Sequence, residues 1–153
     1  MNSSYDVVVV GGGPAGSMAA WEAAKAGTSA CILEKDRDIG YPVRCGEAAG
    51  ESGIKKFVDI NENWIAEKIM GAKLVSPSGI SVDVDFSSET GFILNRRIFD
   101  YDLSRYAANA GAEVYTKAYV KNILINDGQV NGVVLDYLGE EKEIKAKIVI
   151  GAD

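Results

Sequence analysis

A glycine-rich turn near the start of the chain constrains the fold more than any other feature. Residues 11–16 read Gly-Gly-Gly-Pro-Ala-Gly, which fits the pattern G-x-G-x-x-G. The turn follows a run at 5–10 that ends in four valines, and it opens an alanine-rich stretch at 14–26. Dinucleotide-binding folds place this turn between a buried strand and a helix. With a second apolar run at 29–33, the sequence predicts a βαβ unit over 5–34.

Each glycine of the motif has a separate physical role. Gly11 permits the tight turn, Gly13 lets the backbone approach a pyrophosphate, and Gly16 lets the helix pack against the strand. The helix N-terminus adds N–H donors and positive potential. Glu34, at the end of the second strand, can accept hydrogen bonds from a ribose 2′-hydroxyl and would repel a 2′-phosphate. We therefore expect FAD or NAD rather than NADP. The alternatives are a bare glycine turn and a solvated Glu34.

The order of elements after Glu34 favours FAD over NAD. A Rossmann dehydrogenase would continue with a helix and a third parallel strand, whereas a polar, glycine-rich loop at 36–53 follows here. Such long loops in compact domains are usually functional or mobile. Alternating runs at 119–147, with Asp127-Gly128 as a hairpin turn, predict a β-meander in place of a crossover helix. The expected fold is thus α/β: a Rossmann-like, two-dinucleotide-binding FAD domain with a parallel sheet and a β-meander.

The remaining segments complete one expected domain over residues 1–153. Region 54–95 reads as an insertion, and apolar spacing at 98–110 predicts a helix. A strand at 148–150 runs directly into Gly151-Ala152-Asp153, so we expect the domain to be truncated. Inside the insertion we expect short helices at 54–59 and 64–70 and strands at 73–75, 80–86 and 91–94.

Composition excludes several classes of function. The net charge is −6 and there is no long basic run, so nucleic acid is not expected as a partner. The chain has no histidine, which excludes Ser-His-Asp chemistry and a His-ligated metal within it, and we expect no metal site. No apolar stretch near the start could span a bilayer. We expect a cytoplasmic protein that touches a membrane only peripherally, through parts outside this sequence.

Residues 41–47, Tyr-Pro-Val-Arg-Cys-Gly-Glu, carry a more specific signal. Together with the glycine motif and Glu34-Lys35, they closely resemble the geranylgeranyl reductases of archaea and bacteria, a family that includes digeranylgeranylglycerophospholipid reductases. Residues 93–100 resemble the family's segment of an arginine followed by a helix with Phe-Asp, with Arg96 the better match. Residues 151–153 resemble the start of its Gly-Ala-Asp-Gly turn. The resemblance covers essentially the whole chain.

The resemblance implies which residues would line an FAD-binding site. Arg44 and Arg96 would offer cations to the pyrophosphate or the flavin oxygens, and Cys45 would face the isoalloxazine; the alternative for each arginine is a solvated side chain. Cys31, in an apolar run, is expected in the core, without a disulfide. No catalytic residue is identified. The cofactor-binding candidates, from motif and resemblance together, are Gly11, Gly13, Pro14, Ala15, Gly16, Glu34, Lys35, Arg44, Cys45, Gly46, Arg96 and the backbone near Val120.

The activity implied by the resemblance is hydrogenation of isoprenoid C=C bonds by reduced flavin. The substrate would be a polyprenyl lipid or a quinone tail, and the electrons would come from ferredoxin or NAD(P)H. In the family, the aromatic substrate-binding stretch and a second flavin-contacting Gly-Asp segment lie beyond Asp153, so these residues alone are not expected to catalyse. The alternatives are a flavin monooxygenase or halogenase of the same fold, against which the 42–47 run argues, and a truncated non-catalytic FAD-binding fragment.

Overall fold

The chain forms two compact units. The computed structural model describes residues 1–86 and 90–153. The first unit contains residues 1–43 and 100–153, and the second contains residues 44–99. Chain length alone predicted one domain. The second unit has its own strands and its own buried residues, and it extends beyond the insertion expected at 54–95 on both sides.

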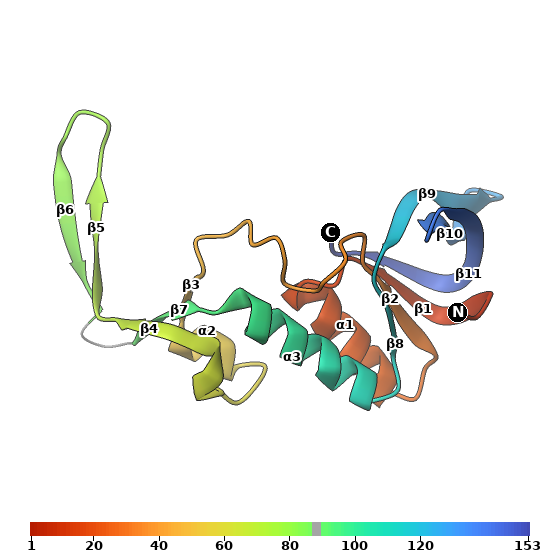
Figure 1. Cartoon of the computed structure of the whole chain (residues 1–153), viewed down its shortest axis with the longest axis horizontal. Helices are drawn as coiled ribbons and strands as arrows, with labels where there is room; N and C mark the ends of the chain where they lie inside the picture. Colours follow the sequence, from red (N-terminus) through yellow and green to blue (C-terminus); the bar gives the residue numbers. More distant parts are fainter. Residues whose placement is uncertain (87–89) are drawn as a thin grey trace. The chain divides into compact units, whose positions relative to one another are not determined.

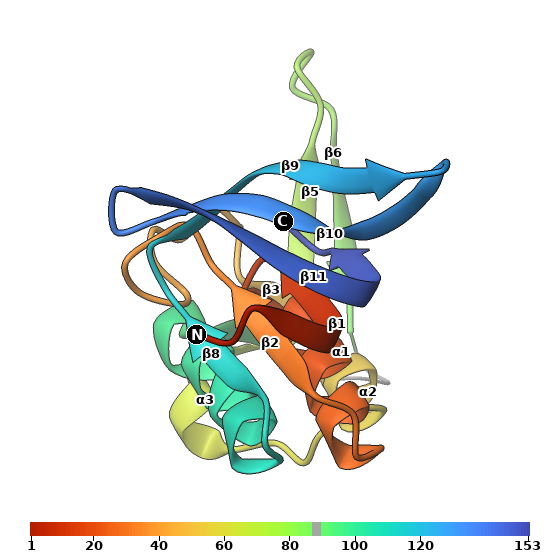
Figure 2. The same cartoon turned by 90° about the vertical axis from the view of Figure 1, so that its right-hand side faces the viewer.

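A six-stranded sheet forms the centre of the first unit (Figures 1 and 2). Four strands are parallel, and the last of them continues into an antiparallel meander. This arrangement confirms the predicted fold class, an α/β domain with a parallel sheet and a β-meander. The order across the sheet is β8 (Glu113–Tyr115), β2 (Ala30–Leu33), β1 (Ser4–Val10), β11 (Glu140–Gly151), β10 (Gln129–Tyr137) and β9 (Ala118–Asn126).

Strand β11 serves both halves of the sheet. The sequence predicted two strands, at 143–147 and 148–150, but one strand runs over Glu140–Gly151. Its first half pairs antiparallel with β10, and from Lys145 onward it pairs parallel with β1. The alternating polar and apolar residues of the meander therefore continue, within one strand, into the apolar run at its end. The change from an alternating to an apolar pattern suggests two strands in the sequence, but it marks only a change of neighbour along one strand.

Two apolar layers cover the two faces of this sheet. Helix α1 (Pro14–Lys25) and the part of α3 (Arg96–Asn109) that belongs to the first unit cover one face. Their alanines pack on β1 and β2, and small side chains let helix and sheet approach closely. The meander closes over the other face, where Cys31 and Leu33 of β2 are fully buried. The helical layer contains Val7, Val9, Ala20, Ala24, Ala30, Ile32, Ala107 and Ala112.

The second unit contains a small sheet and a separate hairpin. Its three strands lie in the order β3 (Ala48–Gly50), β7 (Gly91–Leu94) and β4 (Ile65–Ile69). The hairpin of β5 (Gly71–Val75) and β6 (Ser81–Asp85) extends away from that sheet (Figure 1). Trp64, which ends the short 3-10 helix η1 (Glu62–Trp64), is fully buried, and its ring meets Phe99 edge-on at 5.1 Å.

Two helix predictions in this unit were wrong. Residues 64–70 form strand β4 rather than a helix, because pairing with β7 decides between two patterns that both place Ile65 and Ile69 on one side. The helix expected at 54–59 lies earlier, at Glu51–Lys55 (α2), where Glu51 and Lys55 form an ion pair one turn apart. The predicted loop at 36–53 likewise contains a strand, β3.

A carboxylate ties three strands of the first unit together at the surface. Asp6 of β1 accepts hydrogen bonds from Lys147 Nζ at 2.7 Å and from the Ser29 amide and hydroxyl at 2.9 and 2.7 Å. Lys147 belongs to β11 and Ser29 immediately precedes β2. These donors, Lys147 above all and then Ser29, hold the pKa of the Asp6 carboxyl well below its usual range.

The lowered pKa of Asp6 predicts an acid-sensitive contribution to stability. A carboxyl whose pKa is depressed by folding stabilises the fold above its unfolded pKa of about 4, and that contribution is lost as the pH falls further. We expect the melting temperatures of the wild type and Asp6→Asn to differ at pH 7, and the gap between them to narrow progressively as the pH falls below about 4. Thermal melts across this range check it. A gap between the two melting temperatures that stays constant with pH would contradict the role assigned to Asp6.

Gly132 lies at a bulge in the pairing of β10 with β9, and on its other side it pairs with Lys145 of β11. Its φ is +150°, and a Cβ there would lie 2.1 Å from the Ile144 carbonyl oxygen. We expect Gly132→Ala to lower the free energy of unfolding by about 2–4 kcal/mol, from backbone strain and overpacking together. The control is Gly139→Ala, also at positive φ but facing open space, which should cost about 1–2 kcal/mol. Urea denaturation measures both, and equal losses would refute the steric argument.

Candidate functional site

The glycine turn lies at the carboxyl ends of strands β1, β2 and β11 and packs tightly against them. Gly11 has a φ of +100°, and a Cβ there would lie 2.7 Å from the Ala152 carbonyl oxygen. The Gly11 amide donates to the Leu33 carbonyl at 2.9 Å, and the Ala152 amide donates to the Val10 carbonyl at 2.8 Å. The turn leaves β1 between the carboxyl ends of β2 and β11, the edge at which open α/β sheets bind ligands.

Helix α1 rests directly on this turn. A Cβ on Gly16 would lie only 2.0 Å from the Gly11 carbonyl oxygen, so no other residue fits. The next residue, Ser17, is fully buried, and its hydroxyl donates to the Gly12 carbonyl at 3.1 Å. Sequence reasoning missed Ser17; the available signal was a small hydroxyl residue placed directly after the motif's last glycine.

The N-terminus of α1 is open on the side where Gly13 caps it. Gly13 has φ −70° and ψ −176°, and a Cβ built on it would meet nothing within 4 Å. Pro14 begins the helix, Ala15 is exposed, and the first turn carries no acidic residue and no side-chain cap. This end of the helix therefore presents backbone N–H groups and its positive dipole end to open space, which suits a diphosphate.

Glu34 borders the same space with a carboxylate held in place. Its Oε2 accepts from the Gly12 amide at 2.7 Å, and its Oε1 accepts from the Asp36 amide at 2.8 Å. Its backbone accepts from the Ala118 amide at 2.8 Å and donates to the Tyr115 carbonyl at 2.8 Å. Each carboxylate oxygen keeps acceptor capacity for a further donor, as a ribose diol requires.

The segment after Glu34 folds back onto the glycine turn. Ile39 is buried, and a Cβ on Gly12 would lie 3.1 Å from two atoms of its side chain. The Lys117 amide donates to the Asp36 carbonyl at 3.0 Å, which ties the segment to the start of the meander. Sequence reasoning missed Ile39. It could have been found as a single branched apolar residue within an otherwise polar part of the loop.

The two other candidates of the first unit flank Glu34. Lys35 follows it and is exposed. Val120 lies in β9, two residues after Ala118, whose amide bonds to the Glu34 carbonyl; it is half-buried and packs on the core beneath the meander. The fold thus gathers eight of the twelve predicted residues around one strand edge of the first unit: Gly11, Gly13, Pro14, Ala15, Gly16, Glu34, Lys35 and Val120.

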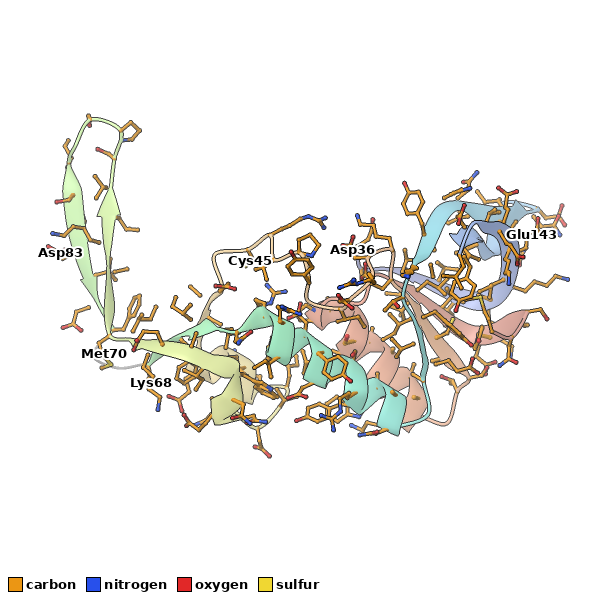
Figure 3. All side chains as sticks on the ribbon, in the orientation of Figure 1. Asp36, Cys45, Lys68, Met70, Asp83 and Glu143 are labelled. Atoms are coloured by element: carbon orange, nitrogen blue, oxygen red, sulfur yellow. The ribbon has the colours of Figure 1, made fainter. Side chains whose placement is uncertain are left out.

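The other four candidates belong to the second unit. Arg44, Cys45 and Gly46 lie on the exposed segment that leads into β3, where Figure 3 labels Cys45. The Cys45 sulfur accepts from the Glu47 amide at 3.4 Å, and Glu47 adopts a φ of +63°. Arg96 is the first residue of α3.

Cys31 takes no part in the site. Its side chain is fully buried beneath the meander, and burial, with a smaller effect of Glu113, raises the pKa of its thiol to about 12. A thiol that stays protonated is a poor nucleophile, so Cys31 is a core residue, as the sequence predicted.

The turn, the open helix end and the fixed acid together define a dinucleotide-binding protein. A sequence profile described as an FAD-binding domain matches residues 4–153. The chain belongs to this FAD-binding domain family, and its cofactor is FAD.

Individual proteins similar to this chain are more informative than the domain family alone. Digeranylgeranylglycerophospholipid reductase 1 of Methanococcoides burtonii is 42% identical over 156 aligned positions, which include the whole chain. The crystal structure of a geranylgeranyl bacteriochlorophyll reductase-like protein from Thermoplasma acidophilum matches 99% of the chain with a TM-score of 0.89 and 36% identity. A flavin-dependent brominase, Bmp2, matches 98% of the chain with a TM-score of 0.75 and 24% identity, which shows the shared fold. The chain spans 38% of the first relative's length, 39% of the second's and 38% of the third's.

The geometry of the first unit fits the adenosine diphosphate part of FAD. The open space at Gly13 and the uncapped end of α1 suit the pyrophosphate, and the Glu34 carboxylate suits a ribose with both hydroxyls free. The same acid disfavours a 2′-phosphate.

Alanine substitutions at the glycines of the motif should have separable effects on stability and on FAD affinity. Alanine at Gly13 meets open space and an ordinary backbone conformation, so Gly13→Ala should leave the melting temperature of the FAD-free protein unchanged while its methyl enters the pyrophosphate space. We expect FAD to bind about tenfold more weakly or worse, a loss of roughly 1.4 kcal/mol or more. Quenching of flavin fluorescence measures the affinity.

Gly16→Ala is the matched control. Its methyl would collide with the Gly11 carbonyl, so the melting temperature itself should fall. If Gly13→Ala lost stability as well, or kept full FAD affinity, the space beside it would not be the pyrophosphate site.

Proposed function

We propose that this chain forms the FAD-binding part of a reductase that saturates the C=C bonds of geranylgeranyl or other polyprenyl chains in lipids. One observation carries the proposal: the whole chain is 42% identical to a protein named digeranylgeranylglycerophospholipid reductase. The match to the Thermoplasma structure supports it in three dimensions. A fold alone does not fix an activity, so the sequence identity over the whole chain is the stronger support.

In this proposal the adenosine diphosphate part of FAD binds to the first unit. The N–H groups around Gly13, Ala15 and Gly16 bind the pyrophosphate, and Glu34 accepts from the ribose. Pro14 begins the helix that presents these donors, and Lys35 and the Val120 backbone border the adenosine. In the second unit Arg44 and Arg96 supply positive charge, and Cys45 and Gly46 lie against the flavin ring.

The hydride for one carbon of the alkene would be supplied by FAD in its bound, reduced form, and the other carbon would take one proton. The residues of this chain orient the cofactor and exclude water, and none of them is assigned as the donor of that proton. The substrate is a polyprenyl lipid or a quinone tail, and electrons arrive from ferredoxin or NAD(P)H. The protein works in the cytoplasm and touches the membrane at its periphery. Among the described helices, none is long and apolar enough to cross a bilayer.

A flavin monooxygenase or halogenase is the second candidate, because a flavin-dependent brominase shares the fold. At 24% identity that likeness concerns the fold alone. The Pro-Val-Arg-Cys-Gly-Glu run at 42–47 favours the reductase. The third candidate is a polypeptide that binds FAD without turnover.

The test uses the complete gene product loaded with FAD and reduced without oxygen. A digeranylgeranyl glycerophospholipid should restore the oxidised flavin absorption and gain one dihydrogen per saturated double bond by mass spectrometry. The matched control is the same lipid with fully saturated chains, which should leave the flavin reduced. Flavin that is reoxidised equally by both lipids, or only by oxygen together with an aromatic substrate and halide, would reject the reductase.

A further inference from the structure

Ser17 places a hydroxyl group in the buried, alanine-rich face of α1. Among the described buried residues of this helix, it is the only one with a polar side chain. Ala20 and Ala24 follow on the same face, three and seven residues later. Burying a hydroxyl is unfavourable unless it is hydrogen-bonded, and an alanine would continue the row without that requirement. The partner of the hydroxyl, the Gly12 carbonyl at 3.1 Å, therefore shows what Ser17 contributes.

Ser17 holds two successive carbonyl groups of the glycine turn. Its backbone amide donates to the Gly13 carbonyl at 2.9 Å, which is the first bond of the helical ladder. Its hydroxyl donates to the Gly12 carbonyl, which lies one residue before the N-cap and therefore outside that ladder. The direction of the Gly12 carbonyl is thus set by a side chain and not by the regular bonding of the helix.

Gly12 is also held on its other side. Its amide donates to Glu34 Oε2 at 2.7 Å, so each of the two peptide groups that meet at Gly12 is bonded to a side chain. Gly12 lies between two further glycines, and glycine restricts its own backbone less than any other residue. The direction of the peptide groups in this turn therefore depends on Glu34 and Ser17.

The bond from Ser17 also sets the direction of the Gly13 amide. The Gly12–Gly13 peptide bond is trans, and the C=O and N–H groups of a trans peptide point in opposite directions. Because the Gly12 carbonyl is directed at the buried Ser17 hydroxyl, the Gly13 N–H points away from Ser17. Gly13 itself borders open space, where a Cβ would meet nothing within 4 Å.

We infer that Ser17 is a positioning residue of the FAD site, whose hydroxyl holds the Gly12–Gly13 peptide group so that the Gly13 amide donates to the FAD diphosphate. The inference rests on the proposed function for the placement of the diphosphate beside Gly13, and it is independent of the lipid substrate. Because Ser17 is fully buried, it acts through the turn and not by touching the cofactor. A donor that is fixed before the ligand arrives lowers the ordering cost of binding.

The test uses the complete gene product, freed of FAD and then titrated with it. Ser17→Ala should weaken FAD binding about tenfold, because a hydrogen bond to a charged diphosphate is no longer aligned. Quenching of flavin fluorescence gives the affinity. At saturating FAD, phosphorus NMR should show a changed chemical shift for the diphosphate of the bound cofactor.

Two further variants separate positioning from a general loss of packing. Ala24→Gly removes a methyl group from the same buried face at the far end of α1, and glycine within a helix lowers stability. It should lower the melting temperature but keep the FAD affinity and the phosphorus spectrum of the wild type. Ser17→Cys retains a side chain of similar shape, but a thiol is a weak donor. It should therefore lose FAD affinity as Ser17→Ala does, and it carries the test if the alanine variant does not fold.

The outcomes distinguish this inference from the proposed function. If either Ser17 variant binds FAD as tightly as the wild type, or if both bind it more weakly with an unchanged phosphorus spectrum, the role of Ser17 is overturned. If Gly13→Ala keeps full FAD affinity, the diphosphate does not lie beside Gly13, and the role of Ser17 fails together with that placement. None of these measurements uses turnover, so a failure to reduce prenyl lipids would reject the reductase and leave the result for Ser17 standing.

Discussion

The contact between Gly16 and the Gly11 carbonyl is the constraint on which the rest of the first unit depends. It sets how close α1 comes to β1, and a single methyl group at Gly16 could not be accommodated without moving the helix or the turn. The same closeness directs the first-turn amides of the helix across the carboxyl edge of the sheet. The alanines along α1 extend the close packing to its far end. The close packing of α1 and the open presentation of its first-turn amides therefore have one cause.

Glu34 connects this turn to elements far from it in sequence. Its side chain is fixed by amides on both sides, from Gly12 and Asp36, while its main chain lies between the end of β8 and the start of β9. The carboxylate thus has a defined orientation before any ligand arrives. Pre-organisation of this kind lowers the ordering cost of binding. A solvated Glu34, the alternative left open by the sequence, does not describe this geometry.

Sequence reasoning succeeded where a local pattern had only one structural solution. The glycine motif, the buried strands beside it and the Asp-Gly hairpin turn fixed the fold class of the first unit. It failed for β4, because isoleucines four residues apart suit a helix and a strand equally, and only the distant partner β7 decides between them. Sequence reasoning also could not predict the contact among Tyr5, Glu113 and Tyr115. Glu113 accepts hydrogen bonds from both tyrosine hydroxyls, and Tyr5 meets the other two residues only because of the order of the strands in the sheet. Ile39 and Ser17 were missed because single residues carry no periodicity.

The double pairing of β11 has a consequence for the order in which the chain folds. Strands β9, β10 and β11 are consecutive and antiparallel, so they can assemble by local hairpin closure. The neighbour of β11 on its other side, β1, lies far earlier in the sequence. During synthesis β1 emerges long before β11, the second of its two parallel partners, so one edge of β1 stays unpaired while the glycine turn and α1 are already complete. Closure of the central sheet is therefore a late, long-range step, and until then a run of four valines depends on α1 and β2 for protection from aggregation.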